Sequence, residues 1–412
     1  MTDGLDKRIE DKRDELIALT QDLIRIPTLN PPGDCYREIC EYLRDRLAPR
    51  GFECTLVRAE GAPGDSTRHP RWNIVARREG TRPGECVHFN SHTDVVEVGS
   101  GWTRDPFGGE LDGDRIYGRG ACDMKGFAAC AMAVAPQLAA AQLSRPVYFC
   151  FSYDEEVGCL GAPAIARHLA ALPVPPEFAI IGEPSMMELV TGQKGKIAMR
   201  AHVTGTSGHS SFAPEHVNAV EYAARAIAMI SERGKRYETE GPFDHDFTVP
   251  HATMLATMIE GGVATNVTPE SCSFTFELRS IAGMDPEADM AELLARIEAE
   301  VGAEMAAKTA GTGIAFEQIF SYPPMGEARN TAGFARYARR MPEAWGGKVS
   351  YGSEGGIFEL TGGIPSVIVG PGSIEQAHKP NEFVALEQLD ACVAFLEGFV
   401  AELSAAPSEA RG

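Results

Sequence analysis

Residues 87–94 read VHFNSHTD, and this stretch decides the fold: it is an apolar run that ends in a histidine and an aspartate. Three further apolar runs, at residues 147–152, 178–182 and 366–370, are also followed by acids or by a histidine. Helix-like segments, among them one predicted helix over residues 124–141, alternate with the runs. This alternation predicts an α/β fold with a mixed, mostly parallel sheet flanked by helices. The carboxyl ends of the strands in such a sheet line one crevice, where ligands bind. The polar residues after the runs are therefore expected to converge.

A second type of pattern begins near Gly192. From residue 196 to residue 319, the segments follow the order strand, helix, strand, strand, helix, strand. This order is typical of an α+β unit with four antiparallel strands and two helices on one face. We therefore predict a discontinuous first domain, residues 1–191 and 322–412, and an inserted second domain, residues 192–321.

The composition excludes several classes of partner. The 412-residue chain has a formal net charge of -20, which disfavours binding to nucleic acid or to an anionic membrane. Its N-terminus is charged without an apolar signal core, and its longest apolar stretch, residues 127–141, is too short to span a bilayer. The ten cysteines form no Cys-x-x-Cys pair. These features are typical of a cytoplasmic protein whose thiols stay reduced.

The motif His92-Thr93-Asp94 follows the first apolar run. A lone histidine at the end of a strand is more often structural, but Asp94 is two residues away and projects to the same side. A carboxylate that bonds the second ring nitrogen fixes the tautomer of a ligand histidine. We interpret His92 as a metal ligand and Asp94 as the residue that orients it.

Asp123 lies in the glycine-rich segment GRGACDMKG, residues 118–126. One interpretation is a helix cap, because aspartate often caps the helix that it precedes. The other is a metal bridge, because the glycines permit close approach of the backbone and a carboxylate has two oxygens. The two interpretations are compatible.

Three consecutive acids, Asp154, Glu155 and Glu156, follow the run at residues 147–152. Acids in such a position repel one another unless cations are present. Neighbouring side chains of an extended chain point in opposite directions, so one glutamate can bind metal while the other serves as a general base.

Glu183 follows the third run, and His378 follows the fourth. With the residues above they complete a donor set of two histidines, one bridging aspartate, two ligand glutamates and one spare glutamate. This set suits two divalent metal ions, zinc first, with cobalt or manganese as alternatives.

On these motifs the chain resembles a family of dinuclear zinc amidases and exopeptidases, which includes acetylornithine deacetylase, succinyl-diaminopimelate desuccinylase, aminoacylase and glutamate carboxypeptidase. The resemblance covers nearly the whole chain. It implies two metal sites that share one aspartate, the first formed by His92, Asp123 and Glu183 and the second by Asp123, Glu156 and His378. It also implies that Glu155 is the general base, that Asp94 orients a ligand, and that the peptide after Asp123 is cis.

The predicted inserted domain has motifs that are similar to those of the same family. His209, in GTSGHSS, resembles a histidine that stabilises the oxyanion, and the alternative is a plain surface residue. Asn266 and Arg279 resemble residues that contact substrate, and a guanidinium suits bidentate binding of a carboxylate. An ion pair on the strand is the alternative for Arg279. Relatives often dimerise through this domain, in some of them with the His209 and Asn266 positions serving the neighbouring subunit, so a homodimer is expected.

Two segments bear on the substrate. GPGSIEQAH, residues 370–378, is most similar to the acetylornithine deacetylase branch. The segment YGSEGGIF, residues 351–358, keeps the acidic position of that branch at Glu354, which Ser353 precedes, and both are predicted to bind substrate. Its neighbours depart from the Thr-Glu-Ala-Pro pattern of bacterial members, which affects the predicted pocket for the ornithine side chain.

The resemblance thus implies an enzyme that cleaves the amide bond of a small N-acyl amino acid, with N-acetylornithine as the first candidate. The alternatives are a deacylase or deformylase of another small N-acyl amine, a succinyl-diaminopimelate desuccinylase-like enzyme, and a metallo-carboxypeptidase or dipeptidase. A different class is an inactive binding protein on the same scaffold, which is disfavoured because every ligand position is filled. Nucleotide-binding glycine motifs do not follow any predicted strand.

Overall fold

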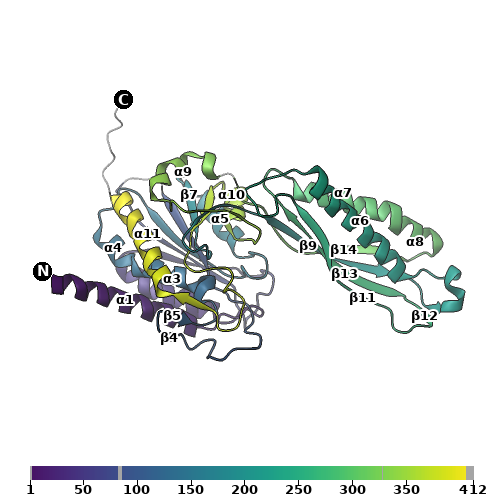
Figure 1. Ribbon diagram of the computed structural model, residues 1–412, viewed down its shortest axis with the longest axis horizontal. Helices are drawn as coiled ribbons and strands as arrows, with labels where there is room; N and C mark the ends of the chain where they lie inside the picture. Colours follow the sequence, from purple (N-terminus) through teal and green to yellow (C-terminus); the bar gives the residue numbers. More distant parts are fainter. Residues whose placement is uncertain (1, 82–85, 327, 405–412) are drawn as a thin grey trace. The chain divides into compact units, whose positions relative to one another are not determined.

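The computed structural model describes residues 2–81, 86–326 and 328–404 (Figure 1). The chain divides into two compact units. Unit 1 comprises Met1–Gly192, Gly326–Gly347 and Ser353–Gly412, and unit 2 comprises Gln193–Met325 and Lys348–Gly352. The predicted class, an α/β domain with an additional α+β unit, is confirmed.

Unit 1 is built on an eight-stranded mixed sheet in the order β1-β2-β6-β3-β7-β16-β8-β15. The strands are β1 (Glu53–Arg58), β2 (Trp72–Arg78), β3 (Val87–His92), β6 (Val147–Ser152), β7 (Phe178–Ile181), β8 (Leu189–Gln193), β15 (Trp345–Val349) and β16 (Ser366–Ile368). The central strands β6, β3, β7 and β16 are parallel to their neighbours in this group, and β1, β2 and β8 pair antiparallel. Every residue of β3, β6 and β7 is buried, as expected for strands covered on both faces.

Helices pack against this sheet. They are α1 (Thr2–Arg25), α2 (Tyr36–Leu47), α3 (Gly126–Ala133), α4 (Ala135–Ala140), α5 (Ala162–Ala170), α9 (Ala332–Tyr337), α10 (Gly355–Gly362) and α11 (Leu386–Ser404). The apolar stretch at residues 124–141, expected as one helix, is divided into α3 and α4. Pro136 lies in the first turn of α4. Its ring and its missing N–H group interrupt a helix interior but suit a helix start, which explains the division.

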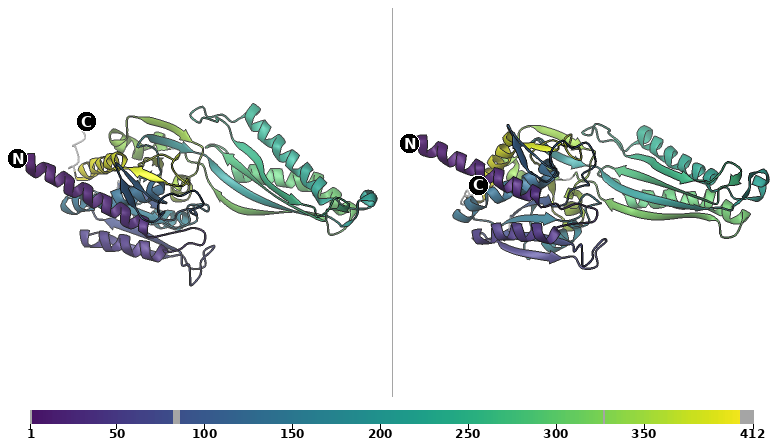
Figure 2. Two further views of the ribbon diagram at one scale, coloured as in Figure 1. Left: turned by 60° about the horizontal axis from the view of Figure 1, so that its bottom comes forward. Right: turned by 90° about the horizontal axis from the view of Figure 1, so that it is seen from below.

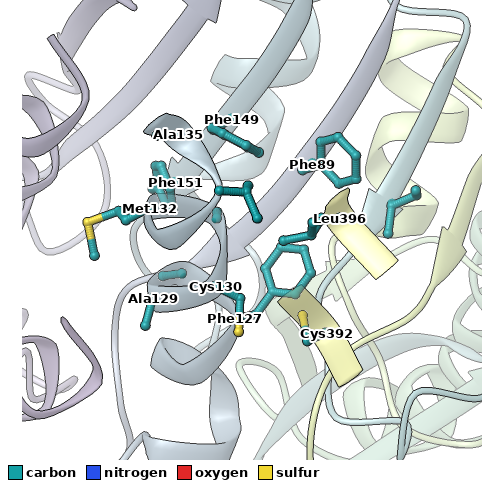
Figure 3. Packing of buried hydrophobic residues seen from close by; sticks show 14 of the residues in the cluster. Phe89, Phe127, Ala129, Cys130, Met132, Ala135, Phe149, Phe151, Cys392 and Leu396 are labelled. Carbon is teal, nitrogen blue, oxygen red and sulfur yellow. The ribbon is translucent and has the colours of Figure 1, made fainter. Parts of the chain in front are cut away.

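The two faces of β3 have different roles. Phe89 belongs to the main core, where side chains of α3 and α11 pack over Phe149 and the neighbouring strand residues (Figure 3). Because side chains alternate along a strand, His88 and His92 lie on the opposite face. There the His88 ring packs edge-on against Phe358 of α10 at 4.5 Å between ring centroids.

A small sheet connects two distant segments of unit 1. It has the order β17-β5-β4, formed by β4 (Glu110–Asp112), β5 (Arg115–Tyr117) and β17 (Phe383–Ala385). Tyr117 pairs with Phe383 in its antiparallel register. The chain shortly before Asp123 is thereby aligned with the chain shortly after His378.

Unit 2 is a four-stranded antiparallel sheet in the order β11-β13-β9-β14, with helices on one face (Figure 2). The elements are β9 (Gly195–Thr204), β11 (Thr253–Gly261), β13 (Ser271–Ser280), β14 (Gly313–Tyr322), α6 (Ala219–Glu240), α7 (Pro286–Ile297), α8 (Ala303–Lys308) and the short pair β10 (Gly208–His209) and β12 (Val267–Thr268). Alternate residues of β13 are buried under the helices, which explains the period of two in its sequence. Among the described residues, no helix is both long and apolar enough to cross a bilayer.

Candidate metal centre

The candidate ligands of unit 1 lie at the carboxyl ends of adjacent parallel strands. His92 is the last residue of β3, Glu155 and Glu156 follow β6, and Glu183 follows β7. The register aligns His92 with Ser152 at the end of β6. Neighbouring strands that end at the same edge of a sheet deliver their next residues to one crevice, as the sequence predicts.

Asp123 faces both histidines. It lies in the turn before α3, and its Oδ1 is 2.9 Å from Nε2 of His92. Its Oδ2 is 3.3 Å from Nε2 of His378, which belongs to the loop between β16 and β17. The Asp123–Met124 peptide is cis. One carboxylate thus directs one oxygen to each side, which is the arrangement of a bridging group.

The glutamates complete two groups of possible ligand atoms. Oε1 of Glu183 is 4.0 Å from Nε2 of His92, and Oε2 of Glu156 is 3.0 Å from Nε2 of His378. Ligand atoms of His92, Asp123 and Glu156 lie within 4.8 Å of one another, as do those of His92, Glu155 and Glu183. Glu155 therefore lies among the candidate ligands themselves.

Asp94 lies behind this cluster and contacts two of its segments. Its Oδ1 is 3.5 Å from Nδ1 of His92, and its carbonyl oxygen is 3.0 Å from the same nitrogen. The backbone N–H groups of Glu155 and Glu156 donate to its two carboxylate oxygens at 3.0 and 3.1 Å. Asn30 donates a further hydrogen bond at 2.9 Å. Asp94 thus contacts the histidine mainly through its backbone carbonyl, and its carboxylate holds the loop of the glutamates.

The electrostatics of the cluster fit divalent cations. Burial raises the pKa of Glu155 and Glu183 well above the ordinary value of glutamate, and nearby acids raise them further. Hydrogen bonds to Asp123 and Glu156 raise the pKa of His378 to about 11. In the part of the chain that the structure describes, no lysine or arginine pairs with these acids. Several buried carboxylates around two imidazoles, without any other cation, form a donor set that zinc, cobalt or manganese would satisfy.

Asp154 differs from the two acids that follow it. Its backbone has a φ of 52°, a left-handed conformation that turns the chain. Its side chain accepts hydrogen bonds from Arg71 Nε at 2.8 Å and from the Tyr36 hydroxyl at 2.6 Å. Of the three consecutive acids, only Glu155 and Glu156 therefore lie in the cluster, and Asp154 has its counter-ion within the chain.

Glu382 borders the cluster, and the sequence argument did not single it out. It is buried, and it pairs with the buried Arg119 at 2.8 Å. Burial raises its pKa to about 7; the charge of Asp123 adds to this shift and Arg119 opposes it. In the sequence, Glu382 is a single acid after His378 and Arg119 is a single arginine between glycines. Neither position indicates that the two side chains form a pair.

The two predicted substrate residues of unit 1, Ser353 and Glu354, are buried at the start of α10. Glu354 Oε2 accepts hydrogen bonds from Asn90 of β3 and, at 2.6 Å, from Ser152 of β6. Burial raises the pKa of Glu354 to about 7. The carboxylate therefore lies on the His92 face of the sheet and contacts the chain rather than open solvent.

Three predicted residues lie in unit 2. His209 is exposed on β10, and its Nδ1 accepts the N–H of Ser211 at 3.2 Å. Asn266 precedes β12, and its carbonyl accepts the N–H of Ser210 at 3.0 Å. The β10–β12 pair therefore brings His209 and Asn266 together. Arg279 of β13 binds Glu277 at 2.9 Å, the ion pair that the sequence left as an alternative.

Comparison with known proteins gives consistent matches over most of the chain. A model described as peptidase family M20/M25/M40 matches residues 88–402. The acetylornithine deacetylase of Myxococcus xanthus is 32% identical over 375 residues, covering 88% of this chain and 91% of that protein. The acetylornithine deacetylase of Pasteurella multocida is 30% identical and covers 86% and 88%.

Solved structures with similar folds include peptidases. The M20 family metallo-carboxypeptidase Sso-CP2 of Sulfolobus solfataricus has a TM-score of 0.71 at 18% identity, covering 95% of this chain and 99% of that chain. The di-peptidase Dug1p of Saccharomyces cerevisiae has a TM-score of 0.71 at 15% identity, covering 98% of both chains. At these identities the likeness concerns the fold alone.

Proposed function

Since the chain belongs to peptidase family M20/M25/M40 and is a metal-dependent hydrolase, we propose that it releases the amine from a small N-acyl amino acid at a centre for two divalent ions. N-acetylornithine is the first candidate substrate. Support for this substrate comes from relatives named acetylornithine deacetylase at 30–32% identity over most of their length. The main support for the dinuclear centre is Asp123, whose two oxygens face His92 and His378.

The proposed ligands divide into two sets that share Asp123. One set adds His92 and Glu183, and the other adds Glu156 and His378. Two ions held there would polarise the scissile carbonyl and lower the pKa of the attacking water. Zinc is the first candidate for both, and cobalt and manganese fit the same nitrogen and oxygen donors.

Glu155 is the proposed general base. Its carboxylate lies within 4.8 Å of possible ligand atoms of His92 and Glu183, and its backbone is held by Asp94. It takes a proton from water as the water oxygen attacks the acyl carbon. When the carbon–nitrogen bond breaks, Glu155 gives this proton to the departing amine, and the products are a carboxylate and a free amine.

The proposal also assigns substrate contacts to the residues that the motifs single out. His209 would donate to the oxyanion, Asn266 would contact the substrate, and Arg279 would bind the substrate carboxylate. Ser353 and Glu354 would act at the side-chain pocket, Glu354 through the strand residues that it contacts. These assignments follow the motif positions given above.

We extend the proposal to a homodimer formed through unit 2 in the cytoplasm. Support comes from β11, an edge strand of its sheet, which exposes Leu255, Met258 and Ile259. An exposed apolar edge strand is suited to pairing with a second copy. Sedimentation equilibrium tests this: a Met258→Lys variant should shift the protein toward monomer, and a monomeric wild-type protein would contradict the dimer.

A substrate panel tests the reaction. Protein loaded with zinc, cobalt or manganese is assayed for amine release from N-acetylornithine, N-succinyl-diaminopimelate, several N-acetyl and N-formyl amino acids, and dipeptides. We expect the highest kcat/KM for N-acetylornithine, by at least about tenfold, or 1.4 kcal/mol, over dipeptides. A preference for another compound would replace this substrate, and metal-loaded protein without activity toward any of them would overturn the reaction class.

A further inference from the structure

Arg119 and Glu382 form a buried ion pair beside the cluster. Arg119 is 2% exposed and Glu382 is 1% exposed, and Nη1 of the arginine lies 2.8 Å from Oε2 of the glutamate. A buried ion pair is weak evidence for stability, because desolvation of the two charges can outweigh their attraction. The contacts made by its remaining polar atoms therefore indicate its role better than the pair itself.

The second oxygen of Glu382 holds the turn that contains Asp123. Oε1 accepts the backbone N–H groups of Cys122 at 3.0 Å and of Asp123 at 3.2 Å. The carbonyl of Glu382 also accepts the N–H of Gly118 at 2.9 Å, next to the pairing of β5 with β17. The glutamate is thus bonded to the candidate bridging residue itself.

The remaining donors of Arg119 extend to two more loops. Nη2 donates to the carbonyls of Glu97 and Val98 at 3.2 and 3.1 Å, in the segment that follows β3. Nη1 is 3.5 Å from the carbonyl of Lys379, the residue after His378. One ion pair therefore connects three segments that carry candidate ligands or lie next to them.

We propose that Arg119 and Glu382 are positioning residues that set the placement of Asp123 relative to His378, and thereby the affinity of the metal site that these two share with Glu156. The inference depends on the metal centre proposed above, but not on the substrate. Neither residue is a metal ligand in this proposal. Their effect is exerted through backbone bonds to the loops that carry the ligands.

The test is metal binding by the metal-free protein. In Glu382→Gln the amide oxygen can still accept the two backbone N–H groups, but the charge that holds Arg119 is lost. Loss of such a supporting partner commonly weakens metal binding by about 10- to 100-fold. Titration with cobalt, followed by calorimetry and by visible absorption, should show a change of this size for one of two bound ions, and a smaller change for the other.

A matched control separates positioning from general stability. Glu402 of α11 also pairs with arginines, Arg339 and Arg340, and lies outside the candidate centre. Glu402→Gln should bind both ions as the wild type does, even if its thermal unfolding temperature falls. An equal loss of cobalt affinity in Glu402→Gln would overturn the positioning role.

Two further variants test the same inference if Glu382→Gln does not fold. Arg119→Lys keeps the charge but loses the guanidinium fork, and it should weaken the same cobalt site by a smaller factor. Glu382→Asp should restore part of the affinity. Wild-type affinity for both ions in folded Glu382→Gln, or in Arg119→Lys, would overturn the inference. Cobalt that does not bind to the wild-type protein at all would overturn the metal centre as well, whereas wild-type binding without amide hydrolysis would affect only the proposed reaction.

Discussion

Two groups of buried carboxylates lie in unit 1, and they differ in what neutralises them. Asp154 and Glu382 each pair with a buried arginine at 2.8 Å. Asp123, Glu156 and Glu183 have only imidazoles as cationic neighbours among the described residues. A buried charge is costly unless it is paired or coordinates a metal. The chain supplies the counter-charge for the first group, and the second group is therefore the one suited to ions from solution.

The difference distinguishes acids that hold loops from the acids that are candidate metal ligands. Asp154 directly precedes Glu155, Glu382 lies four residues after His378, and both acids are buried. Burial and acidity alone would thus assign them to the metal site. The partner across the fold decides, because an arginine at 2.8 Å already supplies the counter-charge that a buried carboxylate needs.

Removal of divalent ions should have the largest effect. Dialysis against a chelator is expected to reduce amide hydrolysis to background, and readdition of zinc or cobalt should restore it. It should also lower the thermal unfolding temperature, because an ion present at 100 times its dissociation constant contributes about 2.7 kcal/mol to the native state. Elemental analysis verifies that the ions have been removed. Activity that persists in such protein would contradict the conclusion that the second group of carboxylates binds ions.

Glu155→Gln should abolish most activity and leave the metal content intact. Loss of a general base commonly costs about 10²–10⁴ in rate. The amide keeps the size of the side chain but cannot take the proton. The measurement is kcat beside the number of bound ions per chain. A variant that loses an ion would show that Glu155 is a ligand, and full turnover would refute its role as the base.

Arg71→Met tests the carboxylates that are neutralised by an arginine of the chain. It leaves Asp154 buried without its cation, and removal of one partner of a buried pair costs about 3–5 kcal/mol. Urea unfolding measures the loss. The double variant Arg71→Met/Asp154→Asn should recover part of it, because a neutral amide at this position needs no counter-charge. A loss below about 1 kcal/mol in the single variant would count against the assignment.

In metal-free protein, Glu183→Gln should change the free energy of unfolding in the direction opposite to that of Arg71→Met. The substitution removes one of several mutually repelling charges, so the free energy of unfolding without ions should stay the same or rise. In the presence of zinc the same variant should be the less stable one. A destabilised metal-free Glu183→Gln protein would mean that the cluster is neutralised within the chain after all.

The smallest effect is expected for His88, which lies on the same face of β3 as His92. Burial lowers the pKa of His88 to about 3, whereas acidic partners raise that of His92 well above its ordinary value despite burial. Because the unfolded chain binds a proton near pH 6.5 and the folded chain does not, His88 reduces stability as the pH falls from about 6.5 toward 3, by up to about 1.4 kcal/mol per pH unit. In His88→Leu the slope of unfolding free energy between pH 6.5 and 5 should decrease by about one proton. An unchanged slope would show that His88 is charged in the folded state.

Much of the fold could be predicted because its helices and strands follow from the local periodicity of apolar residues. The alternation of apolar runs and helical segments predicts the sheet of unit 1, and the period of two in residues 271–279 predicts a half-buried strand of unit 2. The division of residues 124–141 was missed because apolar composition indicates a helix more strongly than one proline indicates its interruption. The candidate ligands could be named because parallel strands place the residues after their ends at one edge.

The sequence by itself determined the class of fold, the order of its elements and which residue types stand at the strand ends, because these depend on neighbours a few positions apart. Only the tertiary structure decided which buried acids have a counter-ion. Asp154 meets Arg71, which directly precedes β2, and Glu382 meets Arg119 across 263 residues of chain. Charge compensation acts through space over a few ångströms, so no local pattern in the chain encodes it.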